Sequence, residues 1–114
     1  MKQIKVTLAN RIYIPTLFPE FGNFETAIII NDIRNKLKIT QEELLNCEIE
    51  TIEDISGSKT ISWKKSKIIE IEFTDLEFEF LVELFKEKNV NKELKLDFDT
   101  LNFYSQLMFG KELS

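Results

Sequence analysis

Two capping boxes set the strongest constraint on how this chain can fold. The segments Thr40-Gln41-Glu42-Glu43 and Thr74-Asp75-Leu76-Glu77 each place a Thr at the N-cap of a helix and a Glu three positions later. Between them, apolar and polar residues alternate around Ile61/Trp63 and Ile69/Ile71/Phe73, which is typical of strands with one buried face. We therefore expect a meander of three strands, at about 48–54, 59–64 and 67–73, enclosed between two helices. Gly57 is expected in the first turn of this meander.

The remaining segments predict one more strand and two more helices. Residues 2–8 alternate as a strand does, whereas residues 9–17 fit either a short helix or an extended segment, because Pro15 argues against a long helix. Residues 24–38 follow a candidate N-cap, Asn23, and have apolar residues at helical spacing. The apolar face expected for this helix consists of Phe24, Ala27, Ile28, Ile30, Ile33 and Leu37.

The helix that begins at the second capping box is expected to run to about Lys88, with Asn89 as its left-handed stop. A last helix is expected from Phe98 to Phe109, ended by Gly110. This order predicts an α+β fold, in which a small antiparallel β-sheet of about three or four strands packs against about three or four α-helices. With 114 residues, the chain is expected to form a single globular domain over residues 1–114.

The composition excludes several kinds of catalytic site. The chain has no His, one Cys and three Gly, so it lacks Ser-His and Cys-His pairs, zinc sites built from His or Cys, and glycine-rich phosphate loops. Cys47 is expected in the core, and the Asp97/Asp99 pair either holds Mg²⁺ or supplies the cap of the last helix, which we favour. We therefore expect a protein that is not an enzyme and that needs no cofactor or metal ion.

Charge and hydropathy bear on the class of partner and on location. The net charge is −5, whereas nucleic-acid binders usually carry a basic balance, so direct nucleic-acid binding is not expected. No apolar run is long enough for a membrane span, and the N-terminus lacks the pattern of a signal peptide. The expectation is an acidic, cytoplasmic protein.

Three phenylalanines mark the first candidate binding site. Phe18, Phe21 and Phe24 bracket a loop that contains Pro19 and Gly22. If these rings are exposed, they form an aromatic contact surface for another protein. If they are buried, the loop closes one end of the core.

Charged residues mark two further candidates. Lys64 and Lys65 stand beside Trp63 in a basic stretch that runs from Lys59 to Lys67. This stretch either binds phosphate or a base, or pairs with the acidic strands on both sides, and we favour the pairing. Glu79, Glu83 and Glu87 recur every four residues, which suits either a partner's basic surface or, as we favour, a solvated helix face.

One longer pattern resembles small proteins encoded in bacteriophage and prophage genomes. The sequence pattern of those proteins is roughly LLP-x-x-G-N-x-x-T-x-x-I-x-x-D-L-R-x-K-L-x-x-x-x-E-E. They also tend to have a Trp inside a β-meander and a Leu-Tyr pair in the last helix. The residues of this chain that match the pattern are Leu17-Phe18-Pro19-Glu20-Phe21-Gly22-Asn23-Phe24-Glu25-Thr26, Ile28-Ile29, Asp32-Ile33-Arg34, Leu37, Thr40-Gln41-Glu42-Glu43-Leu44 and Trp63. Phe103-Tyr104 departs slightly from the closing pair, and residues 90–97 are longer and more charged. The resemblance implies a phage context, in the cytoplasm of the infected host, and no particular biochemical activity.

These observations together predict a small accessory protein of a phage that acts by binding. In its most concrete form, it binds a protein partner and inhibits a host protein or a host defence system. One alternative is a component of the virion or of its assembly that forms a homo-oligomer. A second alternative is a protein that sequesters a small anionic ligand such as a nucleotide, through Trp63 and the lysines around it.

Overall fold

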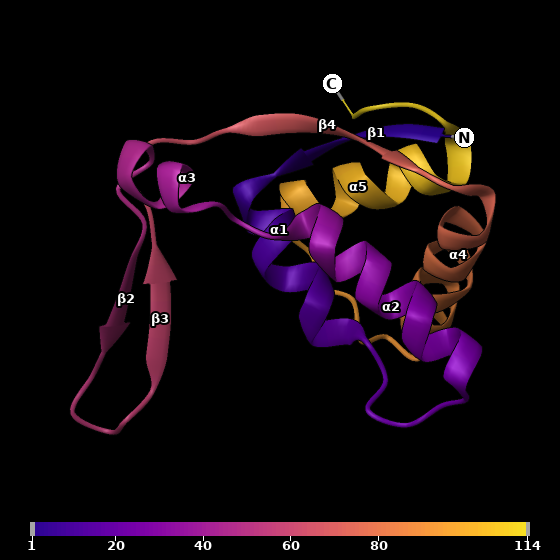
Figure 1. The fold of residues 1–114 in the computed structure, drawn as a ribbon, viewed down its shortest axis with the longest axis horizontal. Helices are drawn as coiled ribbons and strands as arrows, with labels where there is room; N and C mark the ends of the chain where they lie inside the picture. The colour runs from indigo at the N-terminus through magenta and orange to yellow at the C-terminus, as the bar shows by residue number, and fades with distance from the viewer. Residues whose placement is uncertain (1, 114) are drawn as a thin grey trace.

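The computed structural model describes residues 2–113 and shows an α+β fold (Figure 1). Four antiparallel strands form two separate two-stranded sheets, and the helices pack mainly beneath the sheet made by the two terminal strands. The elements in chain order are β1 (Lys2–Thr7), α1 (Leu8–Tyr13), the 3-10 helix η1 (Ile14–Leu17), α2 (Phe24–Leu37), α3 (Gln41–Asn46), β2 (Glu50–Glu53), β3 (Lys59–Ser62), β4 (Ile68–Phe73), α4 (Asp75–Val90) and α5 (Phe98–Phe109).

The expected α+β class is confirmed, but the expected three-stranded meander is wrong. β4 pairs with β1, so that Ile4 lies opposite Ile71 and Val6 opposite Ile69. β2 and β3 form a hairpin of their own, with Glu53 opposite Lys59. The inner face of β4 is apolar throughout, and β1 offers it an apolar partner, whereas β3 has only Ile61 between two polar strand residues.

The core lies between the β1–β4 sheet and the helices below it. Its largest side chains are Phe73, Phe85 and Phe103, and the rings of Phe85 and Phe103 lie 5.2 Å apart. Apolar residues of β1, β4, α2, α4 and α5 complete the same cluster. This core fixes the orientation of α2 and α4, the two helices that frame the loop at residues 18–23.

The hairpin β2–β3 projects away from this core (Figure 1), and none of its strand residues is buried. The carboxylate of Asp54 shapes its turn by accepting hydrogen bonds from the backbone N–H groups of Ser56 and Ser58, each at 3.0 Å. Gly57 occupies that turn with φ +85°, which a side chain would strain. At the base of the hairpin, the carbonyl of Cys47 accepts both Lys64 N–H and Lys65 N–H at 3.1 Å.

The ends of the helices agree with the sequence in most places. Thr40, Thr74 and Asp97 are N-caps, Gly110 ends α5 with φ +67°, and Cys47 is buried. The expected stop at Asn89 is wrong, because α4 continues to Val90 and the left-handed residue is Lys92. The ambiguous segment after β1 forms α1, capped by Thr7, followed by η1.

The expected apolar face of the 24–38 helix is wrong in its first half. Ile33 and Leu37 are buried, but Phe24, Ala27 and Ile28 are exposed. The fully buried residues of α2 lie in its C-terminal half, and Ile29 and Ile30 pack against the core while partly buried. Phe24, Ala27 and Ile28 stay at the surface. Among residues 2–113, no helix is long and apolar enough to cross a membrane.

Candidate functional site

The three phenylalanines of the loop have different environments. Phe18 is buried, with 7% of its surface exposed, and its ring lies 6.2 Å from Phe80 of α4. The guanidinium of Arg34 on α2 lies over the same ring, 5.4 Å from its centre. Phe18 therefore anchors the loop between α2 and α4, as the buried alternative had it for this one ring.

Phe21 and Phe24 point into solvent, with 88% and 75% of their surfaces exposed. Phe24 and Ile28 lie one helical turn apart on α2, so Ile28, also exposed, continues the same face. We call these three residues the α2 patch. Exposed apolar patches are typical of interaction sites, whereas single exposed apolar residues are not.

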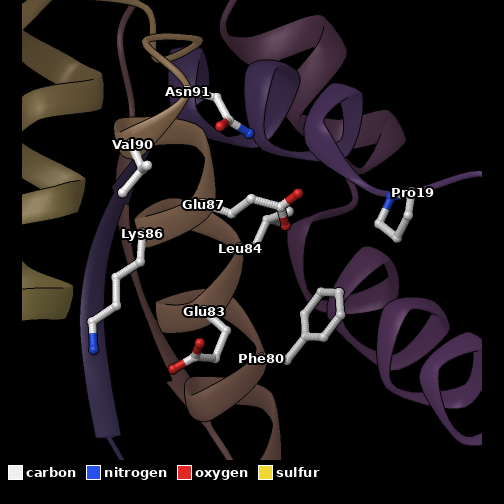
Figure 2. Close-up of a pocket in the computed structure, with 8 residues that line it drawn as sticks. All are labelled: Pro19, Phe80, Glu83, Leu84, Lys86, Glu87, Val90 and Asn91. Atoms are coloured by element: carbon white, nitrogen blue, oxygen red, sulfur yellow. The ribbon is translucent and has the colours of Figure 1, made fainter.

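A groove borders the same loop on its other side. Pro19 faces α4 across a hollow of about 410 Å³, which Phe80, Leu84 and Val90 line with apolar surface. Figure 2 shows Phe80 and the carboxylate of Glu87 between Pro19 and the helix, while Lys86 extends away from Pro19. We call this hollow the α4 groove.

The three glutamates that recur along α4 do not share one environment. Glu83 and Glu87 line the α4 groove, whereas Glu79 is exposed on α4 and does not line it. Two of the three predicted carboxylates therefore line the α4 groove beside the loop. The structure thus brings Glu83 and Glu87 close to the loop, although the sequence indicated no link between them.

The basic stretch is dispersed by the fold. Lys59 and Trp63 line a second cleft of about 340 Å³, between β3 and the α1–η1 segment. Lys64 and Lys65 lie outside it with exposed side chains, and Lys67 pairs with Glu43 at 3.2 Å. Of the expected acidic neighbours, Glu53 lies opposite Lys59 in the strand register, but among residues 2–113 the two form no ion pair. The acidic residues of β4 lie opposite β1 and not β3.

One member of the acidic pair near the last helix, Asp97, has a structural role. Asp97 accepts a hydrogen bond from Thr100 N–H at 2.8 Å and thereby caps α5. Burial opposes its charge, but the hydrogen bonds from Thr100 and the ammonium of Lys95 keep the pKa of Asp97 below its ordinary value. Among residues 2–113, no group of three or more Asp, Glu, Cys or His side chains could hold a metal ion.

Sequence reasoning missed several residues of these sites. Ile28 follows Phe24 at helical spacing, so the signal was present but was attributed to the core. Tyr13 and Lys95 line the cleft with Trp63, and no sequence signal links them, since 82 positions separate them.

Comparison with known proteins leaves the site to be interpreted from its own geometry. No protein-family model, no curated protein and no solved structure matches this chain.

Proposed function

We propose that this chain is a non-enzymatic binding protein that contacts a protein partner through the α2 patch and the adjoining α4 groove. The observation that carries the proposal is the contrast within one loop: Phe18 is anchored in the core, whereas Phe21 and Phe24 are held in solvent. A loop that only closed the core would bury all three rings. A loop anchored by one ring and exposing the others presents a preorganised contact surface.

The energetics favour a partner that covers these rings. Burying a Phe side chain stabilises a complex by about 1.5–3 kcal/mol, so two such rings can anchor an interface of standard size. The α4 groove adds apolar surface on the other side of the loop, and Glu83 and Glu87 line it. A partner surface with an apolar centre and basic residues at its rim complements this arrangement, and the charges would mainly speed association.

The resemblance to phage-encoded proteins gives this proposal its most concrete form. A small acidic protein can inhibit a host protein or a host defence system by covering a surface that the host protein needs. Such inhibition requires complementary surfaces and no reactive group, which accords with a site built from apolar side chains and carboxylates.

A second copy of the chain is the alternative partner that a specific observation supports. The hairpin β2–β3 exposes Ile52 and Ile55, and each of its strands has an outer edge with no strand neighbour among residues 2–113. Exposed edges of this kind pair readily with other strands. In that case the protein is an assembly component, and light scattering at micromolar concentration would show an oligomer.

Affinity capture from lysate of the bacterial host tests the proposal. The bait is the wild-type chain, beside a Phe21→Ser/Phe24→Ser variant and a control, Ile52→Ser/Ile55→Ser, that removes exposed apolar residues elsewhere. We expect one host protein to be retained by the wild type and the control and lost with the first variant. If only the hairpin control loses the captured protein, and that protein is the chain itself, the result would favour a function in assembly.

A further inference from the structure

The cleft between the hairpin and α1 has the chemistry of a small-molecule site, and it shares no lining residue with the α2 patch or the α4 groove. Lys59, Ile61 and Trp63 alternate along β3 and its continuation, so all three side chains face the same side. Opposite them, Ala9, Ile12, Tyr13 and Thr16 follow helical spacing along α1 and η1. The cleft therefore has two facing walls, one formed by alternate residues of β3 and its continuation and the other by one face of α1 and η1.

The charge of the cleft is opposite to that of the whole chain. Its two charged lining residues are Lys59 and Lys95, and no Asp or Glu lines it, although the net charge is −5. Among residues 2–113, no carboxylate lies within ion-pair distance of the Lys59 ammonium. The α4 groove differs in this respect, since two glutamates line it.

One aromatic residue of the lining, Tyr13, is held in place by Lys95. The hydroxyl of Tyr13 accepts a hydrogen bond from Lys95 N–H at 3.0 Å, which fixes the phenol ring on the segment before α5. The ammonium of Lys95 lies 5.9 Å from the centre of that ring and 3.3 Å from an oxygen of Asp97. An anion bound beside Tyr13 would meet this ammonium without large movement of the chain.

We propose that this cleft binds a small planar aromatic anion, of the chemical class of a nucleoside monophosphate. Trp63 and Tyr13 offer aromatic faces to the base, and Lys59 and Lys95 offer charge to the phosphate. A volume of about 340 Å³ lies within the range of about 300–1,000 Å³ that is usual for small-molecule sites. A polynucleotide suits the site less well, because its many phosphates would meet an acidic protein.

The fluorescence of Trp63 tests this directly, because it is the only Trp of the chain. The probes are AMP, which carries both base and phosphate, adenosine, which carries the base alone, and inorganic phosphate. We expect AMP to change the emission saturably, with an affinity at least about tenfold above those of adenosine and phosphate. Lys59→Gln and Lys95→Gln should each weaken AMP binding by about tenfold, since each removes one phosphate contact.

Matched controls separate the cleft from general charge effects. Lys65→Gln removes a lysine of the same basic stretch outside the cleft, and Lys86→Gln removes one on α4, so both should leave AMP affinity unchanged. Tyr13→Ala, read by calorimetry, should also weaken binding. Emission that is blue-shifted and insensitive to AMP would show that the hairpin closes onto α1, and this would overturn the proposal. Equal weakening by all four lysine variants, or tighter binding of a short oligonucleotide than of AMP, would overturn it as well.

Discussion

The guanidinium of Arg11 and the carboxylate of Glu43 form two parallel hydrogen bonds, Nη1 to Oε2 at 2.6 Å and Nη2 to Oε1 at 2.7 Å. Both side chains are buried. Arg11 also donates to the carbonyls of Leu37 and Lys38 at the end of α2, and Glu43 accepts the N–H of Thr40 at 3.0 Å. This pair joins α1, the end of α2 and the start of α3, and so fixes the segment from which the hairpin departs.

Breaking this pair should destabilise the fold strongly. Arg11→Met leaves the carboxylate of Glu43 buried with one fewer cation, and the loss of one partner from a buried pair typically costs about 3–5 kcal/mol. Urea denaturation at neutral pH measures the change in the free energy of unfolding. Glu112→Gln serves as the control, because it breaks the exposed pair with Lys5 and should change stability by less than about 1 kcal/mol. Equal effects of the two substitutions would contradict the assignment.

The same pair should make the stability of the fold depend on pH in the acidic range. The hydrogen bonds from Arg11, against the opposing effect of burial, hold the pKa of Glu43 well below its ordinary value of 4.5. The unfolded chain therefore takes up this proton at a higher pH than the folded chain does. The stabilisation is complete above the unfolded pKa and is lost as the pH falls from about 4.5 toward the folded pKa.

Unfolding experiments between about pH 7 and pH 3 on the wild type and on Glu43→Gln measure this effect. The stability difference between the two proteins should shrink as the pH falls. Glu77 is present in both proteins, so the effect of its titration on stability cancels in this difference. A difference that stays constant with pH would show that Glu43 is not the group that titrates.

Gln106 of α5 closes the outer edge of β1. Its side-chain amide accepts Lys5 N–H at 2.9 Å and donates to the Lys5 carbonyl at 3.0 Å, as a neighbouring strand would. Gln106→Ala should cost about 1–2 kcal/mol, because two hydrogen bonds are lost. It also opens a strand edge, so light scattering should reveal association at high concentration. Gln41→Ala, an exposed position on α3, should show neither effect.

Substitutions of the buried ring and of an exposed ring of the loop should differ in their effect on stability. Phe18→Ala removes a buried ring that contacts Phe80 and Arg34, and this should cost about 3 kcal/mol. Phe21→Ala removes an exposed ring and should change the free energy of unfolding by less than about 0.5 kcal/mol. Thermal and urea unfolding of both variants measure the two effects. Similar losses from the two substitutions would mean that Phe21 also packs on the core.

Local signals in the sequence predicted the elements well, and long-range pairing was where prediction failed. Thr40, Thr74 and Asp97 act within four residues of their partners, so the sequence alone indicates each cap. The pairing of β1 with β4 joins Thr7 to Ile68 across about half of the chain. The alternation in β4 is equally compatible with β3 as a neighbour.

The candidate site was predictable only in part, for the same reason. Apolar spacing along α2 marks a face, but whether that face meets the core depends on where α4 and α5 lie. Phe18 and Phe21 are alike in sequence context, and only the positions of Phe80 and Arg34 distinguish them. The cleft beside Trp63 depends on Tyr13 and Lys95, which tertiary packing alone brings together.

Site-specific photo-crosslinking in bacterial cells that produce the protein tests the central claim most directly. A photoreactive phenylalanine analogue replaces Phe21 or Phe24 in the α2 patch and, in a control, Ile55 at the exposed tip of the hairpin. We expect positions 21 and 24 to crosslink to one common protein and position 55 not to do so. Crosslinks from position 55 alone, or none from positions 21 and 24, would contradict it.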